Sequence, residues 1–142
     1  MAERVGFSKP ISLDLLNEGC EEWIAGLSKR EYTERLNAYI GQTVTNASDI
    51  RTVRAIVQNV WLNDIDWVHD EAANLARYMT RMERLPLHWS LLLVRYPVFT
   101  DLCTILGHLF ELKDVVSAKQ IKEEIFNKWG ARSTLEAALS KN

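Results

Sequence analysis

The side chains best suited to bind a polyanion lie near the end of the chain, where Arg132, Ser133 and Thr134 follow one another. At the start of a helix that enters the major groove of DNA, such side chains donate hydrogen bonds to phosphates or to base edges. Four lysines of the same region are predicted to lie against the flanking DNA backbone: Lys119, Lys122, Lys128 and Lys141. These residues together predict a nucleic-acid interface.

Two short helices are predicted to position these side chains. Ser117 is a candidate N-cap of the first helix, and Gly130 can adopt the left-handed conformation that ends it. Ser133 or Thr134 is predicted to cap the second helix. The apolar stripe of the first helix consists of Ile121, Ile125 and Trp129. That of the second helix consists of Leu135, Ala138 and Leu139. Two capped helices joined by a turn of three or four residues predict a helix-turn-helix within residues 113–142.

The same two helices also fit an ordinary helical hairpin, in which Glu123, Glu124 and Glu136 dilute the positive charge. A winged form of the motif would need a β-hairpin after Asn142, so either the motif lacks a wing or the sequence is cut short there. The charge distribution favours the DNA interpretation, because residues 113–142 carry 6 Lys/Arg and 4 Asp/Glu, whereas residues 1–112 carry 11 and 15. The net charge of −2 for the whole chain provides no general attraction to phosphate.

A second candidate basic face is formed by Arg77, Arg81 and Arg84. Their offsets of four and three residues place them on one side of a helix predicted over residues 67–84, with Leu75 on its buried side. Clustered arginines can hold phosphates, although such a face is more commonly solvated or paired with carboxylates.

The sequence gives little support for metal binding. Asp64, Asp66, His69, Asp70 and Glu71 have side chains of metal-ligating types, but no second histidine or acidic motif stands at a matching spacing. A helix N-terminus attracts Asp and Glu through its dipole, which is sufficient to explain the cluster. We therefore predict no metal site.

The sequence also gives little support for catalysis. His88 and His108 lie in apolar segments without a Ser, Cys or Asp at the spacing of a catalytic dyad, which predicts buried structural histidines. Cys20 and Cys103 are far apart and are predicted to be buried free thiols in a reducing compartment. No glycine-rich phosphate loop is present. We expect neither enzyme activity nor a cofactor.

The rest of the chain predicts further helices. Ser12 is a candidate N-cap, Ser28 opens a capping-box pattern with Glu31, and another helix begins after Asn46. Apolar helices are predicted over residues 88–96, as the central buried helix, and over residues 98–113. The five tryptophans lie on or beside apolar stripes, which predicts core positions.

No segment alternates with period two for long enough to predict a strand. We therefore predict an all-α bundle of seven or eight helices in a single domain over residues 1–142. The stretch from residue 85 to 94, which lacks charged residues, is about half as long as a membrane span. A cytoplasmic protein without a membrane-spanning segment is expected.

Three segments resemble the BrxA-like small helical proteins of BREX phage-defence islands: LPLHW (85–89), YPVF (96–99) and KWGARST (128–134). The resemblance covers about the C-terminal half of the chain. It implies a compact all-helical protein with a helix-turn-helix part, affinity for DNA and no catalysis of its own.

The expected function is that of a non-enzymatic protein that binds double-stranded DNA through its C-terminal helices. A larger phage-defence-type assembly or a homodimer is expected, because one small motif with a charge balance of +2 would bind weakly. The alternative is a helical adaptor that docks a protein partner and does not bind nucleic acid. A continuous basic strip on the last helix favours DNA, whereas an exposed apolar patch of roughly several hundred Å² favours a protein partner.

Overall fold

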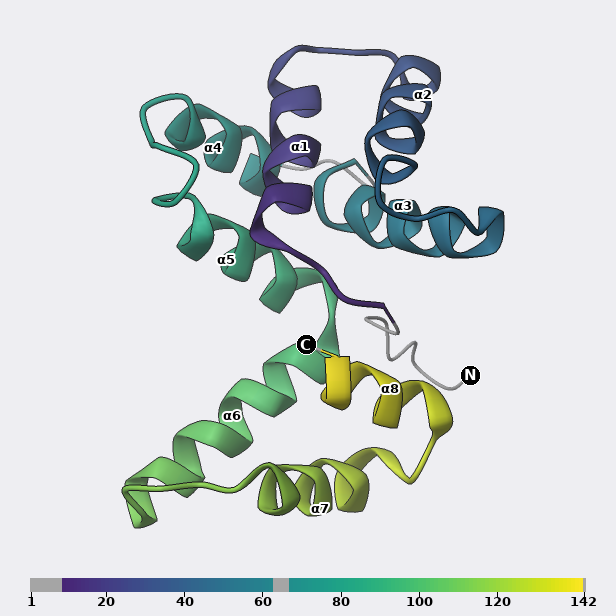
Figure 1. Ribbon diagram of the computed structural model, residues 1–142. Helices are drawn as coiled ribbons and strands as arrows, with labels where there is room; N and C mark the ends of the chain where they lie inside the picture. Colours follow the sequence, from purple (N-terminus) through teal and green to yellow (C-terminus); the bar gives the residue numbers. More distant parts are fainter. Residues whose placement is uncertain (1–8, 63–66, 142) are drawn as a thin grey trace. The chain divides into compact units, whose positions relative to one another are not determined.

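The structure, a computed structural model, describes residues 9–62 and 67–141. Within these ranges the chain forms eight α-helices and no strand, which confirms the prediction of an all-α fold (Figure 1). The helices are α1 (Leu13–Ile24), α2 (Lys29–Ile40), α3 (Ala47–Trp61), α4 (Trp67–Ala76), α5 (Leu85–Arg95), α6 (Pro97–Leu112), α7 (Ala118–Trp129) and α8 (Ser133–Lys141). The chain divides into two compact units: an N-terminal unit, Ile11–Leu91, and a C-terminal unit that contains Leu92 and the helices α6, α7 and α8.

Side-chain caps fix where the first three helices begin. The Ser12 hydroxyl accepts the backbone N–H of Leu15 at 3.1 Å, and the Asn46 side chain accepts two N–H groups of the first turn of α3. At α2 the Ser28 hydroxyl accepts the N–H of Glu31 at 3.3 Å, and the Glu31 carboxylate accepts the N–H of Ser28 at 3.0 Å. The three predicted helix starts are therefore confirmed.

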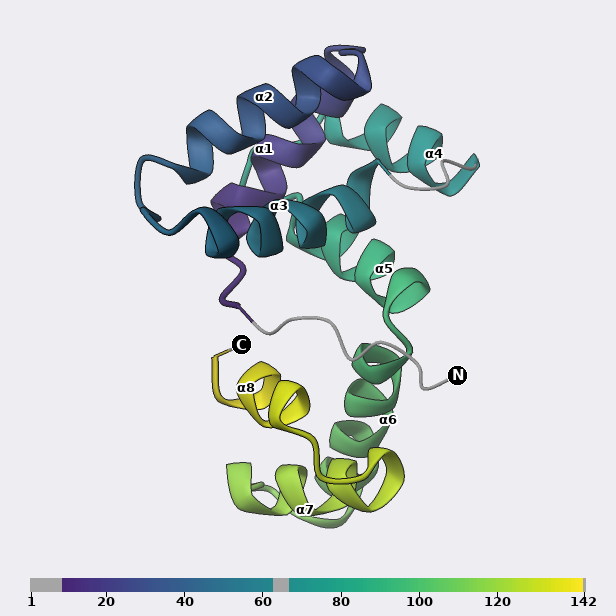
Figure 2. The same cartoon turned by 90° about the vertical axis from the view of Figure 1, so that its right-hand side faces the viewer.

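Helix α1 is the centre of the N-terminal unit and contacts α2, α3 and α4 (Figures 1 and 2). Apolar residues at helical spacing on three helices supply the core between α1, α2 and α3. The buried members of this core are Leu15, Tyr32, Leu36, Ile40, Val53 and Val57.

Gly19 allows α1 to approach α3 closely. A Cβ atom at position 19 would lie 2.5 Å from Cγ1 of Val57 and 3.1 Å from the Tyr32 hydroxyl oxygen. The Tyr32 hydroxyl donates a hydrogen bond of 3.1 Å to the carbonyl of Gly19. The glycine, which weakens α1 as an isolated helix, is therefore needed for tertiary packing.

We expect Gly19→Ala to lower the free energy of unfolding by about 1–3 kcal/mol, because the added methyl group would overpack the contact between α1 and α3. Chemical denaturation monitored by circular dichroism would measure the change. Gly107→Ala in α6 is the matched control, since a Cβ there meets no atom within 4 Å. This control should be neutral or stabilising by up to about 1 kcal/mol. A Gly19→Ala protein as stable as the wild type would contradict the close packing.

Helix α4 ends at Ala76, so the prediction of a helix over residues 67–84 is wrong. The N–H of Tyr78 bonds to the carbonyl of Leu75, three residues earlier, and two short turns, 77–78 and 81–84, replace the helix. The Glu83 carboxylate accepts the backbone N–H of Thr80 at 2.8 Å. Such a local side-chain contact competes with helix continuation. Leu75, predicted to be buried, is half exposed.

Helix α5 is not the central buried helix that its apolar composition predicts. It begins at Leu85, with Pro86 in the first turn, where the missing N–H is tolerated. Leu91 is buried, but Trp89 is 50% exposed and Val94 is 57% exposed. An apolar sequence thus does not ensure that neighbouring elements cover every side of its helix.

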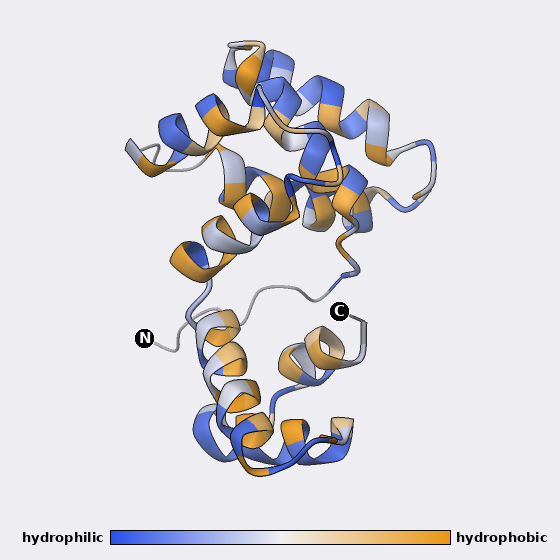
Figure 3. Cartoon of the chain, turned by 90° about the vertical axis from the view of Figure 1, so that its left-hand side faces the viewer, coloured by the Kyte–Doolittle hydropathy of each residue, from blue (hydrophilic) through white to orange (hydrophobic). Residues whose placement is uncertain are grey.

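The prediction that the tryptophans lie in the core is also wrong as a general statement. Of the described tryptophans, Trp61 is fully buried, whereas Trp67 is 75% exposed. Trp23 and Trp129 are partly buried. Figure 3 colours the helices by residue hydropathy and shows hydrophobic positions (orange) interspersed with hydrophilic ones (blue).

The C-terminal unit is built from α6, α7 and α8, and α6 contacts α7 (Figures 1 and 2). Ile125 of α7 and Leu135 of α8 are fully buried. Helix α6 begins within one residue of the predicted start. Despite its apolar sequence, Val98 is the one residue of this helix that is buried. Among the described residues no single helix is long and apolar enough to cross a membrane; α5 and α6 reach that length and composition only when taken as a bent pair.

Candidate nucleic-acid interface

Helices α7 and α8 are joined by a turn of three residues, 130–132, as predicted. The Ser117 hydroxyl accepts the N–H of Gln120 at 3.2 Å, and the Gln120 side chain accepts the N–H of Ser117 at 3.0 Å, which completes a capping box at the start of α7. At its end, Gly130 has φ +75°, a conformation that glycine adopts without steric cost. Both helices are therefore present, and the helix-turn-helix assignment itself stays a prediction.

Helix α8 begins one residue earlier than a cap at Ser133 would allow. The N–H of Glu136 donates to the carbonyl of Arg132 at 3.0 Å, which places Arg132 at the N-cap position. Ser133 and Thr134 thus lie in the first turn, and the prediction that one of them caps α8 is wrong. All three side chains are exposed. The first-turn N–H groups of a helix lack intrahelical acceptors and are suited to anions.

Arg132 lies beside an aromatic ring at the end of α7. Its guanidinium carbon is 6.0 Å from the centroid of the Trp129 ring, within the range of a cation–π interaction. Trp129 in turn donates its indole N–H to the Asp101 carboxylate of α6 at 2.8 Å. The turn is therefore connected to all three helices of the unit.

Two of the lysines predicted to face phosphate have carboxylate partners on other helices. Lys128 Nζ lies 2.6 Å from Asp101 Oδ1, and Lys122 Nζ lies 2.6 Å from Glu136 Oε1. The hydrogen bond from Lys128 is the main cause that lowers the pKa of Asp101. Neither pair could be read from the sequence, because Asp101 and Lys128 lie 27 positions apart and Lys122 and Glu136 lie 14 positions apart.

The other lysines are less constrained. Lys119 is 85% exposed and lies 3.8 Å from the Glu123 carboxylate one turn further on. The side chain of Lys141 lies outside the described part of the chain. Exposed ion pairs of this kind contribute at most about 1 kcal/mol to the stability of the fold. A lysine can therefore exchange its carboxylate partner for a phosphate. Among the described side chains, however, α8 carries no continuous basic strip.

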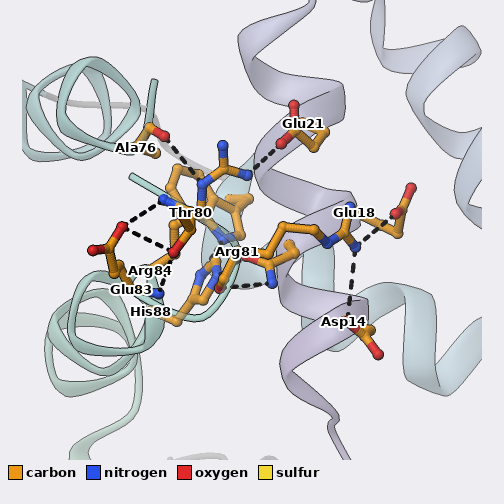
Figure 4. A network of polar contacts seen from close by, with 11 residues as sticks. Asp14, Glu18, Glu21, Ala76, Thr80, Arg81, Glu83, Arg84 and His88 are labelled. Atoms are coloured by element: carbon orange, nitrogen blue, oxygen red, sulfur yellow. Dashed lines mark hydrogen bonds and ion pairs between the residues drawn. The ribbon is translucent and has the colours of Figure 1, made fainter. Parts of the chain in front are cut away.

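The predicted second basic face does not form on one helix, because α4 ends before Arg77 and the three arginines lie beyond it. Figure 4 shows Arg81 and Arg84 beside the carboxylates of α1. Arg84 is buried; its Nε donates to the carbonyl of Ala76 at 3.1 Å, and its guanidinium pairs with Glu21. Arg81 lies 3.0 Å from Glu18 and 3.9 Å from Asp14, both on α1. Arg81 and Arg84 therefore connect the turn region to α1, which agrees with the alternative of pairing with carboxylates.

His88 is fully buried and hydrogen-bonded, as predicted for a structural histidine. Its Nδ1 accepts the indole N–H of Trp61 at 3.1 Å, and its Nε2 lies 2.9 Å from the Asn17 side-chain oxygen. Asn17 also donates to the carbonyl of Arg81 at 3.1 Å. Burial is the main cause that lowers the pKa of His88 to about 4, so the imidazole is neutral at pH 7. The chain of bonds fixes one tautomer, with the proton on Nε2.

His108 is exposed on α6, so the prediction that it is buried is wrong. It lies on a helix of which few residues are covered, although the surrounding sequence is apolar. Cys20 is buried, and burial raises the pKa of its thiol to about 11. Cys103 is only partly buried.

The acidic cluster considered for metal binding is incompletely described, since Asp64 and Asp66 lie outside the described residues. His69 is buried, and its Nε2 lies 2.7 Å from the carbonyl of Val60. Asp70 and Glu71 are exposed. In residues 9–62 and 67–141 no group of three His, Cys, Asp or Glu side chains is arranged to hold a metal ion.

Comparison of the whole chain with protein-family models, with curated proteins and with solved structures finds no match.

Proposed function

We propose that the protein is a non-enzymatic DNA-binding protein whose C-terminal unit meets the duplex with the start of α8. One observation carries the proposal: Arg132, Ser133 and Thr134 are all exposed at the N-terminus of α8, directly after the tight turn at Gly130. The buried Ile125 and Leu135 support this arrangement from the inner sides of α7 and α8.

The chemistry of this helix end suits a phosphate. A guanidinium group, two hydroxyls and the backbone N–H groups of the first turn are donors that lie at the same end of one helix. The charge balance of residues 113–142 is +2, so the electrostatic part of the affinity is small for a single motif. We therefore propose that the protein acts in the cytoplasm within a larger assembly of the phage-defence type, as the BrxA-like resemblance implies, or as a homodimer.

We expect Arg132→Ala to weaken binding to duplex DNA, because it removes the guanidinium at the start of α8. A titration at several salt concentrations would measure the effect. If the arginine contacts a phosphate, all sequences lose affinity similarly and the salt slope falls by about one unit. If it contacts a base, the loss is about 1–3 kcal/mol and specificity relaxes at one position.

Arg77→Ala is the matched control, since Arg77 is an exposed arginine outside the C-terminal unit. It should leave the affinity for duplex unchanged. If Arg77→Ala abolished binding while Arg132→Ala had no effect, the interface would lie elsewhere and the proposal for α8 would be wrong.

The second candidate function is a helical adaptor that binds a protein partner. It is supported by large apolar side chains on the surface of the N-terminal unit, since Trp67 is 75% exposed, Tyr78 91% and Met82 75%. The same unit has an open hollow of about 630 Å³ beside α1 and α4, which Trp23, Leu27 and Ala73 help to line. Absence of salt-sensitive affinity for any duplex at high micromolar protein would favour the adaptor.

A further inference from the structure

The open hollow of the N-terminal unit has the size of a site for a short ligand. Helices α1 and α4 contact each other (Figure 1), and residues at the end of α1 and along α4 line a space of about 630 Å³. Ligand pockets commonly measure about 300–1,000 Å³. The apolar part of the lining includes Trp23 and Leu27, which are half-buried, and Ala73, which is 5% exposed.

Three exposed polar side chains from one side of α4 also line the hollow: Asp70, Asn74 and Arg77. Offsets of four and three residues place them in one row. Arg77 directly follows the helix, and its N–H bonds to the carbonyl of Ala73 at 3.3 Å, so it keeps the helical spacing. At a rise of 1.5 Å per residue, the Cα atoms at the two ends of the row are about 10 Å apart. The row therefore runs from a carboxylate through an amide to a guanidinium group.

The two charged groups of the row have no ion-pair partner within the described part of the chain, either in each other or in a third residue. The next two arginines differ in this respect, because Arg81 and Arg84 pair with carboxylates of α1. Opposite charges are thus available at the two ends of one hollow. They suit a ligand that carries an ammonium group at one end and a carboxylate at the other.

An extended peptide of three residues has these properties, since its charged termini lie about 10 Å apart. The guanidinium group of Arg77 can bind the terminal carboxylate through two N–H groups, and Asp70 can accept from the terminal ammonium. The amide of Asn74 both donates and accepts, which is what a peptide group between the termini requires. An apolar middle side chain would bury its surface against Trp23 and Leu27.

We propose that this hollow is a binding site for zwitterionic peptides of about three residues with an apolar middle residue. Asp70 binds the ammonium end and Arg77 binds the carboxylate end. The site belongs to the N-terminal unit, so this inference goes beyond the proposed DNA-binding function and does not depend on it.

Titration with the tripeptide alanyl-leucyl-alanine at about pH 6.5, where its terminal amine is protonated, tests the inference. Backbone amide chemical shifts in heteronuclear NMR spectra should change in a saturable way at the end of α1 and along α4. The N-acetylated and the C-amidated forms each lack one terminal charge. Each should bind about fivefold more weakly than the free peptide, which is the upper range for an exposed ion pair.

Two variants assign the two ends of the peptide. Arg77→Gln should weaken binding of the free peptide about fivefold and leave the affinity for the amidated form unchanged. Asp70→Asn should do the same for the free and the acetylated forms. The matched controls are Arg51→Gln and Glu71→Gln, since both residues are exposed and neither lines the hollow. Both controls should bind all forms of the peptide like the wild type.

The inference is wrong if millimolar peptide causes no saturable change of the shifts, or if the changes lie away from the hollow. It is also wrong if a peptide blocked at both ends binds as tightly as the free one, because the charged termini would then not be recognised. None of these results bears on DNA binding, which is measured separately through Arg132→Ala. The paired losses with Arg77→Gln and Asp70→Asn, absent in the two controls, support the site.

Discussion

Trp61→Ala is expected to lower the free energy of unfolding by about 3–5 kcal/mol. Trp61 is fully buried in the N-terminal unit, and its ring packs edge-on against His88, with 5.5 Å between the ring centroids. Removal of the indole leaves a cavity, and it also leaves Nδ1 of the buried His88 without its donor. Two losses, of packing and of a buried hydrogen bond, therefore combine at one position.

Trp61→Phe separates the two contributions. Phenylalanine keeps most of the apolar volume but cannot donate to His88, so we expect a smaller loss of about 1–3 kcal/mol. Urea denaturation followed by circular dichroism would give both values. Trp67→Ala is the control, since Trp67 is 75% exposed, and it should change stability much less. If Trp61→Ala and Trp67→Ala had equal effects, the Trp61 side chain would not be the buried anchor that the structure shows.

Acidification is expected to destabilise the N-terminal unit through His88. The pKa of His88 is lowered by burial from 6.5 to about 4 in the folded protein, so below pH 6.5 the unfolded chain binds a proton that the folded state excludes. The loss of stability caused by His88 is absent above about pH 7 and grows as the pH falls from 6.5 towards 4. It then levels off at a loss of about 3 kcal/mol, because one pKa unit corresponds to about 1.4 kcal/mol.

Denaturant unfolding at pH 7.5 and at pH 5 would measure this effect, with an expected loss of about 2 kcal/mol from His88 at pH 5. His88→Gln removes the titrating group while glutamine can still accept from Trp61 and donate to Asn17, so this part of the pH dependence should disappear. His108→Gln, at an exposed position, should retain it. An unchanged pH dependence in His88→Gln would show that other groups cause the acid sensitivity.

The two units carry different kinds of polar interaction. In the N-terminal unit Asn17, Trp61 and His88 form a buried chain of hydrogen bonds, and the loss of one member leaves the others unsatisfied. In the C-terminal unit the pairs Lys122–Glu136 and Lys128–Asp101 have partly exposed partners, which makes them weak and sensitive to salt. Lys119 and Lys128 of the C-terminal unit are consequently more available to an external partner than the buried Arg84 of the N-terminal unit.

The sequence by itself determined the helices and most of their starts. The caps at Ser12, Ser28 and Ser117 form as predicted, and Asn46 caps the helix predicted to begin after it, because a cap needs only a side chain and the N–H groups two or three residues away. The turn at Gly130 was predictable for the same reason, since its conformational freedom is a property of the residue. These features depend on local chemistry alone.

Only the tertiary structure decided which faces are covered and which charges are paired. The apolar segment of α5 predicted complete burial, but Trp89 and Val94 remain exposed, because burial requires a neighbour on every side. The spacing of Arg77, Arg81 and Arg84 predicted one basic face, but the chain turns after Ala76, and Arg81 and Arg84 pair with carboxylates of α1 instead.

The candidate site shows the same division. The sequence identified Arg132 and the helix that follows it, whereas the partners of the lysines, Asp101 and Glu136, come from other helices. The close approach at Gly19 was likewise invisible, because a missing Cβ becomes significant only when another helix occupies its place. Periodicity and capping are encoded over a few consecutive residues, but contacts between distant residues depend on how the helices pack.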